Sequence, residues 1–122
     1  MADMRIPFFK PAISEDDIDA VVDAMRSGWI TSGPNVQALE AELAAYTGAG
    51  YANAVNSCTA ALHLALAAWG IGPGDEVIVP VYTFSATANV VLHCGATPVL
   101  VDVRDSDANM DPAAFEKAIT RQ

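Results

Sequence analysis

Residues 76–103 read EVIVPVYTFSATANVVLHCGATPVLVDV, and this stretch decides the fold. Its two ends, residues 76–81 and 97–103, are short and mostly aliphatic, as is typical of buried strands. Residues 86–92 suit a short helix, and Gly95 is a natural end for it. A strand, a helix and a second strand in this order predict two parallel strands joined by a right-handed crossover.

The same alternation extends in both directions along the chain. Residues 51–55 are interpreted as a further short buried strand, followed by an Ala/Leu-rich helix over residues 59–69 with little polar surface, which we expect to be buried. Asp111 is positioned to cap a last helix whose first turn contains Pro112. Residues 50–122 are therefore predicted to be α/β, with the three strands in one mostly parallel sheet and helices on both faces, a partial three-layer α/β/α domain.

Residues 1–49 show no such alternation and are predicted to form an arm followed by helices. Residues 6–13 contain two prolines and indicate an extended arm. Ser14 is a candidate N-cap for an amphipathic helix that ends near Gly28. A second amphipathic helix is predicted from about residue 36 to residue 46.

Composition excludes several classes of function. The chain has 15 acidic and 6 basic residues, a formal net charge of −9, which makes nucleic acid an unsuitable partner. No apolar run is long enough to span a bilayer, and the first residues do not resemble a signal peptide, so a soluble cytoplasmic protein is expected. Cys58 and Cys94 are interpreted as free thiols, and His63 and His93 as structural residues, so no metal site is predicted.

Two predicted loops carry polar groups at the edge where ligands bind to parallel sheets. Residues 56–61 (NSCTAA) join a strand to the start of a helix, and free N–H groups and the helix dipole there favour an anion. Taken alone, the segment is better explained as an ordinary N-cap. Residues 80–89 follow the next strand and contain Phe84, whose ring either stacks on a planar ligand or packs in the core.

Several motifs occur in a fixed order along the chain. They are GWITSGP at 28–34, NSCTAAL at 56–62, GDEVI at 74–78, TFSATAN at 83–89, GATPV at 95–99 and VDV at 101–103. Together they resemble the DegT-type sugar aminotransferases, a branch of the fold-type-I pyridoxal-phosphate enzymes. The resemblance covers residues 6–120.

The resemblance implies a cofactor, two substrates and a site. The cofactor is pyridoxal 5'-phosphate, and the amino group passes from glutamate to a keto-sugar carried on a nucleoside diphosphate. Phosphate binding falls on the helix start, at the backbone N–H groups of Thr59 and Ala60, and Phe84 lies against the pyridine ring. A second loop lies near the nucleotide-sugar, in a site shared by the two subunits of a homodimer. The implied cofactor residues are Ser57, Cys58, Thr59, Ala60 and Phe84, and the implied substrate residues are Trp29, Thr31 and Ser32.

The chain departs from the family pattern at the catalytic lysine. The motif around that lysine is absent, and the lysines present, Lys10 and Lys117, have different surroundings. We therefore interpret the chain as an amino-terminal portion with no catalytic residue of its own, inactive when alone. Alternatives are a sugar dehydratase of the same fold and a truncated paralogue that acts as an interaction module. A Rossmann-type nucleotide binder is disfavoured because no GxGxxG follows residue 55.

Overall fold

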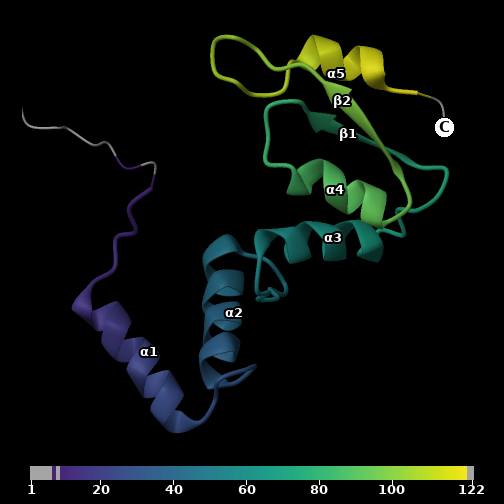
Figure 1. Cartoon of the computed structure of the whole chain (residues 1–122). Coiled ribbons are helices and arrows are strands. Elements are labelled where there is room, and N and C mark those ends of the chain that lie inside the picture. Colours follow the sequence, from purple (N-terminus) through teal and green to yellow (C-terminus); the bar gives the residue numbers. More distant parts are fainter. Residues whose placement is uncertain (1–6, 8, 121–122) are drawn as a thin grey trace, which may run out of the picture. The chain divides into compact units, whose positions relative to one another are not determined.

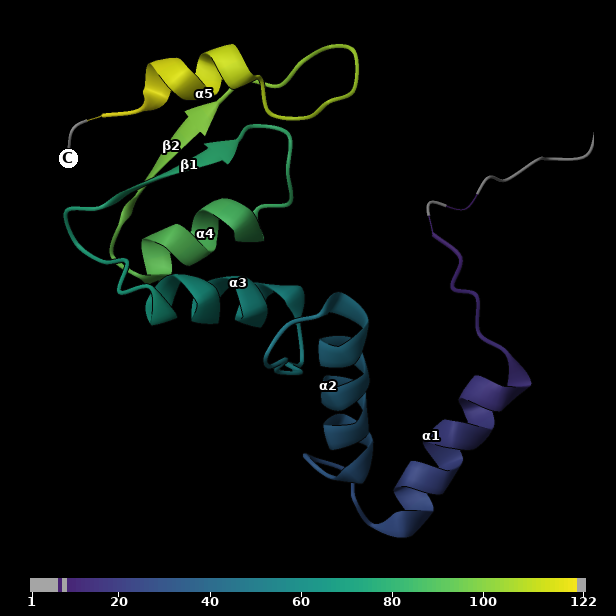
Figure 2. The same ribbon diagram turned by 180° about the vertical axis from the view of Figure 1, so that it is seen from behind.

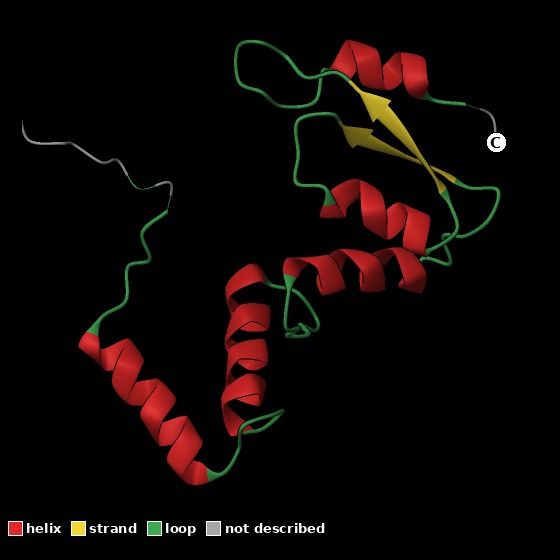
Figure 3. Cartoon of the chain, in the orientation of Figure 1, coloured by secondary structure: helices red, strands yellow, loops and turns green. Residues whose placement is uncertain are grey.

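A computed structural model describes residues 7 and 9–120 of the chain (Figure 1). The chain divides into two compact units, Met1–Ala54 and Val55–Gln122. The first unit contains α1 (Glu15–Ser27) and α2 (Pro34–Thr47). The second contains, in chain order, α3 (Cys58–Ala68), β1 (Glu76–Pro80), α4 (Ala86–His93), β2 (Thr97–Val101) and α5 (Pro112–Ala118) (Figure 3).

Helix α1 begins and ends as predicted. The Ser14 hydroxyl accepts a hydrogen bond from the N–H of Asp17, and the Asp17 carboxylate accepts one from the N–H of Ser14 at 2.8 Å. That backbone bond, together with the Ser14 hydroxyl, lowers the pKa of Asp17. Gly28 adopts φ +80° and ends the helix. Of the predicted arm, residues 6 and 8 lie outside the described residues, and residues 7 and 9–14 have no regular secondary structure.

Helix α2 is slightly longer than the predicted 36–46. It begins at Pro34, which stands in its first turn, where a missing N–H removes no helical hydrogen bond. Its N-cap residue is Gly33, which offers no side-chain acceptor, and Gly48 ends the helix with φ +71°. The extra residues at the start are explained by the fixed φ of proline, which suits the first helical position.

The strand–helix–strand prediction for residues 76–103 is confirmed. β1 and β2 pair in parallel, with Ile78 opposite Val99, and the N–H of Val81 continues the ladder by donating to the carbonyl of Val101 at 2.9 Å. β2 ends at Val101, two residues earlier than predicted. The cause is that Val103 turns away to form an isolated antiparallel bridge with Met110.

The sheet lies between helices, as a three-layer architecture requires. α5 covers one face and α4 the other, and α3 packs against α4 on the side away from the sheet (Figures 1 and 2). The core is formed where α4 meets the strands. Val91 is only 1% exposed and packs with Val79 of β1 and with Ala96, and Leu66 of α3 packs against this cluster. The α/β class is therefore confirmed for residues 55–120.

The predicted strand at residues 51–55 was wrong. The sheet of the described residues has two strands, and residues 51–55 are irregular and mostly exposed. Alanine and asparagine, which occupy the middle of this segment, have low strand propensity. The N–H of Ala54 donates to the Glu40 carboxylate at 2.9 Å, so this donor is satisfied by a side chain of α2 and not by a neighbouring strand.

The expected burial of α3 was also wrong. No residue of this helix is buried, and Leu64 and Trp69 are exposed. A helix buries only the stripe of residues that meets a neighbour, and within the described residues the main neighbour of α3 is α4. Apolar composition predicted the helix correctly but could not show how many of its sides would be covered.

Replacing Val91 tests the importance of the α4 contact. We expect Val91→Ala to lower the free energy of unfolding by about 2 kcal/mol, since it removes buried methyl groups and leaves a cavity. Leu92→Ala is the matched control, because Leu92 is the next residue on α4 but is 57% exposed. Urea unfolding followed by circular dichroism measures both variants. An equal decrease in the free energy of unfolding for the two variants would contradict the proposed core.

Candidate functional site

The polar loops of the α/β unit meet at one end of its sheet. In Figures 1 and 2, β1 and β2 finish at the same end of this unit at which α3 and α4 begin. Two helix amino termini and two strand carboxyl termini therefore share one edge. Open parallel sheets bind ligands at this edge.

The first turn of α3 leaves two backbone donors without an acceptor. The helix begins at Cys58, and its N-cap residue Ser57 accepts a hydrogen bond from the N–H of Ala60 at 3.2 Å. The N–H groups of Cys58 and Thr59 have no acceptor within the part of the chain that the structure describes. Both residues are exposed, and the positive end of the helix dipole lies at this turn.

The predicted helix start is thus confirmed, with one change in the donors. We expected the free N–H groups to be those of Thr59 and Ala60. The N–H of Ala60 is bound by the N-cap hydroxyl, so the free pair is Cys58 and Thr59. The cofactor role of Ser57, Cys58, Thr59 and Ala60 stays a prediction.

Phe84 lies on the loop between β1 and α4 and is 79% exposed. Its ring is therefore available to a ligand. The alternative, in which the Phe84 ring packs in the core, was wrong. The loop is held at the start of α4 by the N–H of Thr87, which donates to the Phe84 carbonyl at 3.0 Å, and by a 2.9 Å bond between the hydroxyls of Thr83 and Thr87. Stacking of the ring on the cofactor stays a prediction.

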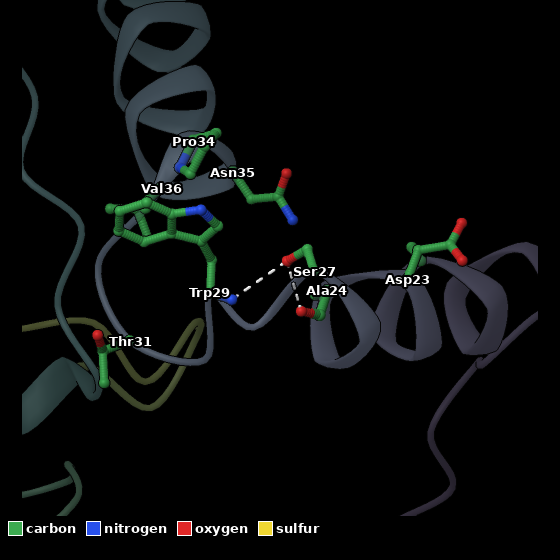
Figure 4. A pocket seen from close by; sticks show the side chains of 10 residues that line it. Asp23, Ala24, Ser27, Trp29, Thr31, Pro34, Asn35 and Val36 are labelled. Atoms are coloured by element: carbon green, nitrogen blue, oxygen red, sulfur yellow. Dashed lines mark hydrogen bonds between the residues drawn. The ribbon is translucent and has the colours of Figure 1, made fainter.

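The predicted substrate residues lie on the turn between α1 and α2, in the first unit. Trp29 and Thr31 line a cavity of about 330 Å³, together with Asp23, Ser27 and Asn35 (Figure 4). Trp29 also lines a second cavity of about 390 Å³, which includes Ser32, Gln37 and Glu40. Each predicted substrate residue thus borders a cavity.

A hydrogen-bonded chain anchors this turn to the end of α1. The N–H of Trp29 donates to the Ser27 hydroxyl at 3.2 Å, and that hydroxyl donates to the carbonyl of Ala24 at 2.7 Å (Figure 4). The predicted cofactor residues belong to the other compact unit. Each predicted set therefore lies within a single unit.

Sequence spacing missed one pairing of titratable side chains. His63 of α3 and His93 of α4 approach edge to face, with ring centroids 5.8 Å apart. Thirty positions separate them along the chain, a spacing with no recognisable periodic signal. Within the described residues, no group of three or more His, Cys, Asp or Glu side chains is placed to hold a metal ion.

The motifs and the fold agree with one protein family. The model of the DegT/DnrJ/EryC1/StrS aminotransferase family matches residues 11–122. The chain belongs to this family. Family membership confirms the resemblance that the six motifs indicated.

Relatives in this family include proteins of sugar metabolism. The chain is 52% identical over 115 residues to the spore coat polysaccharide biosynthesis protein SpsC of Bacillus subtilis, covering 94% of this chain. It is 46% identical over its whole length to the UDP-4-amino-4-deoxy-L-arabinose–oxoglutarate aminotransferase of Shewanella sediminis. The match spans 30% and 31% of those two relatives.

Solved structures of the family have the same fold. The putative sugar aminotransferase Spr1654 of Streptococcus pneumoniae, in its PMP-form, superposes with a TM-score of 0.87 at 49% identity, over 96% of this chain and 30% of that one. The same enzyme is also known in a PLP-form.

Within the described residues, no helix has the length and apolarity needed to cross a membrane.

The N-cap of α3 can be tested against that of α4. We expect Ser57→Ala to destabilise α3 by about 1 kcal/mol, because the N–H of Ala60 loses its acceptor. Ser85→Ala is the matched control, since Ser85 stands at the same position before α4 but makes no capping bond through its side chain. Hydrogen exchange of the amides in the two helices measures the effect. Equal losses of protection at α3 and α4 would show that the Ser57 bond adds nothing.

Proposed function

We propose that this chain serves a homodimeric nucleotide-sugar aminotransferase, which transfers the amino group of glutamate to a keto-sugar on a nucleoside diphosphate. Its relatives named for sugar amination and polysaccharide biosynthesis support this proposal. Pyridoxal 5'-phosphate, when bound, would carry the amino group between the two substrates. The PLP- and PMP-forms of a structural neighbour support the choice of cofactor.

The observation that carries the proposal is the pair of free N–H groups on Cys58 and Thr59. They stand at the first turn of α3, at the ligand-binding edge of the sheet, where a phosphate accepts hydrogen bonds and meets the positive end of the dipole. The side chains of this turn are small, so a phosphate can approach the backbone closely. Of the chain's 15 acidic residues, none lies in residues 51–74 or 77–101, so little negative charge opposes a phosphate there.

The other site residues take complementary roles. Phe84 projects from the next loop at the same edge, and its exposed ring offers a face to the flat pyridine ring. Trp29, Thr31 and Ser32 border the cavities of the first unit, where an indole and two hydroxyls suit a sugar and its nucleotide. Binding and orientation of cofactor and substrate are thus assigned to this chain.

A proline at Cys58 tests the phosphate site without breaking the helix. Cys58 is the first residue of α3, a position that tolerates proline, and Pro34 and Pro112 already stand at the start of α2 and α5. Ser57 has φ −160° and ψ 154°, an extended conformation that a following proline allows. Cys58→Pro therefore deletes one free N–H, whereas the control Cys58→Ala keeps it.

Titration with pyridoxal phosphate, followed by amide NMR shifts of α3, gives the affinity of each variant. We expect Cys58→Ala to bind like the parent chain and Cys58→Pro to bind about tenfold or more weakly, because a charge-assisted hydrogen bond is lost. Circular dichroism verifies that α3 persists. Equal affinity of the proline and alanine variants would refute the phosphate site.

A second prediction concerns the two lysines. Lys10 and Lys117 are both exposed, in the arm and on α5, and neither borders the two cavities described above. We expect borohydride treatment with pyridoxal phosphate to trap no stoichiometric adduct at either lysine, as judged by peptide mass spectrometry. Pyridoxal phosphate is expected to label every exposed amine at a low and similar level, and this labelling is the background against which an adduct is judged. A single adduct at one lysine, formed at one per chain, would contradict the prediction.

A further inference from the structure

We propose that Gly33 is a positioning residue for Trp29. The missing side chain at Gly33 lets the indole lie against the start of α2, and this placement shapes the wall of both substrate cavities. The inference rests on the proposed function of the turn between α1 and α2. It assigns a specific role to a glycine that is not among the predicted substrate residues.

Burial singles out Gly33 first. It is the one buried residue among the described residues up to Ala54. A glycine has only backbone to bury, so another group must cover that backbone. The covering group is Trp29, whose side chain is itself 60% exposed.

The contact is too close for a β-carbon unless a neighbour shifts by a few tenths of an ångström. A Cβ placed on Gly33 would lie 3.1 Å from both Cβ and Cε3 of Trp29 and 3.3 Å from its Cδ2. Carbon atoms in ordinary contact are about 3.5–4.0 Å apart. Any side chain at this position must therefore displace the indole or the turn.

Backbone conformation does not demand glycine at this position. Gly33 has φ −167° and ψ −164°, an extended conformation open to any residue. Gly28, by contrast, adopts φ +80° but would meet nothing within 4 Å if it carried a Cβ. The two glycines of this turn thus serve different needs, one for backbone geometry and the other for close approach of a side chain.

The turn is held on both sides of the indole. Before it, the backbone of Trp29 is bonded to Ser27. After it, the Gly33 carbonyl accepts the hydrogen bond of Gln37 at 3.1 Å, and Pro34 restricts the backbone at the first position of α2. The contacts with Cε3 and Cδ2 are relieved when the indole swings outward toward solvent, whereas the contact with the Trp29 Cβ requires a shift of the turn backbone by a few tenths of an ångström.

The placement matters because both cavities share this contact. Trp29, Gly33, Pro34 and Val36 line each of them. The indole seated on Gly33 is thus a common wall, and moving it changes both cavities at once. A larger residue at Gly33 is expected to weaken ligand binding without unfolding α1 or α2.

The experiment uses fluorescence of Trp29 in the full chain. Trp69→Phe removes the other tryptophan and leaves Trp29 as the reporter. Gly33→Ala and Gly33→Val are compared in this background. Gly50→Ala is the matched control, because a Cβ on Gly50 would meet nothing within 4 Å and its φ is not in the left-handed region.

Acrylamide quenching measures how exposed the Trp29 indole is to solvent, and it needs no ligand. We expect the quenching constant of Trp29 to rise for Gly33→Ala and to rise further, by about a third or more, for Gly33→Val, with helical circular dichroism unchanged, since overpacking pushes the ring outward. Gly50→Ala should match the parent. If Gly33→Val quenches like Gly50→Ala, the inference is overturned.

Binding of UDP, the nucleotide in the name of one relative, separates this inference from the proposed function. We expect UDP to change the fluorescence of Trp29 in the parent and to bind about threefold or more weakly to Gly33→Val. If Gly33→Val binds UDP as tightly as the parent does, the position of the Trp29 indole does not control UDP binding, and that part of the inference is overturned. Raised quenching in Gly33→Val, with no response of the parent to UDP, supports the positioning role and rejects the substrate role of the turn.

Discussion

The packing of α4 against β1 and β2 is the interaction on which the α/β unit depends. Val90 and Val91 are the most deeply buried large side chains among the described residues, and Val91 joins Val79 of β1 in the core cluster. Because α4 also connects the two strands, this packing makes them parallel neighbours. Parallel pairing in turn places the loop after β1 at the edge where α4 begins, which exposes Phe84 at that edge.

The candidate site uses backbone more than side chains. At α3 the groups proposed to bind a phosphate are two amide N–H groups, and at the turn before α2 the feature proposed to position Trp29 is the absence of a side chain at Gly33. Such features carry no charge and form no cluster of titratable residues. They depend on where a helix begins and on how closely one group approaches another.

Local chemistry was enough to predict most element ends. Ser14 and Asp111 cap α1 and α5, and Gly28 ends α1, as their side-chain and backbone preferences indicated. These signals involve residues within four positions of each other, so no distant partner can override them easily. The capping bond from Ala60 to Ser57 obeys the same rule, and it moved the free donors one position earlier than predicted.

The sequence by itself determined the family, the alternation of strand and helix from residue 76 onward, and the positions of the polar turns, because each follows from short-range pattern or motif. Only the tertiary structure decided that residues 51–55 are not a strand, that α3 is exposed, and that Trp29 lies on Gly33. Strand formation requires a partner edge, and burial requires a covering neighbour. Both are supplied by residues distant in the chain, which local pattern does not specify.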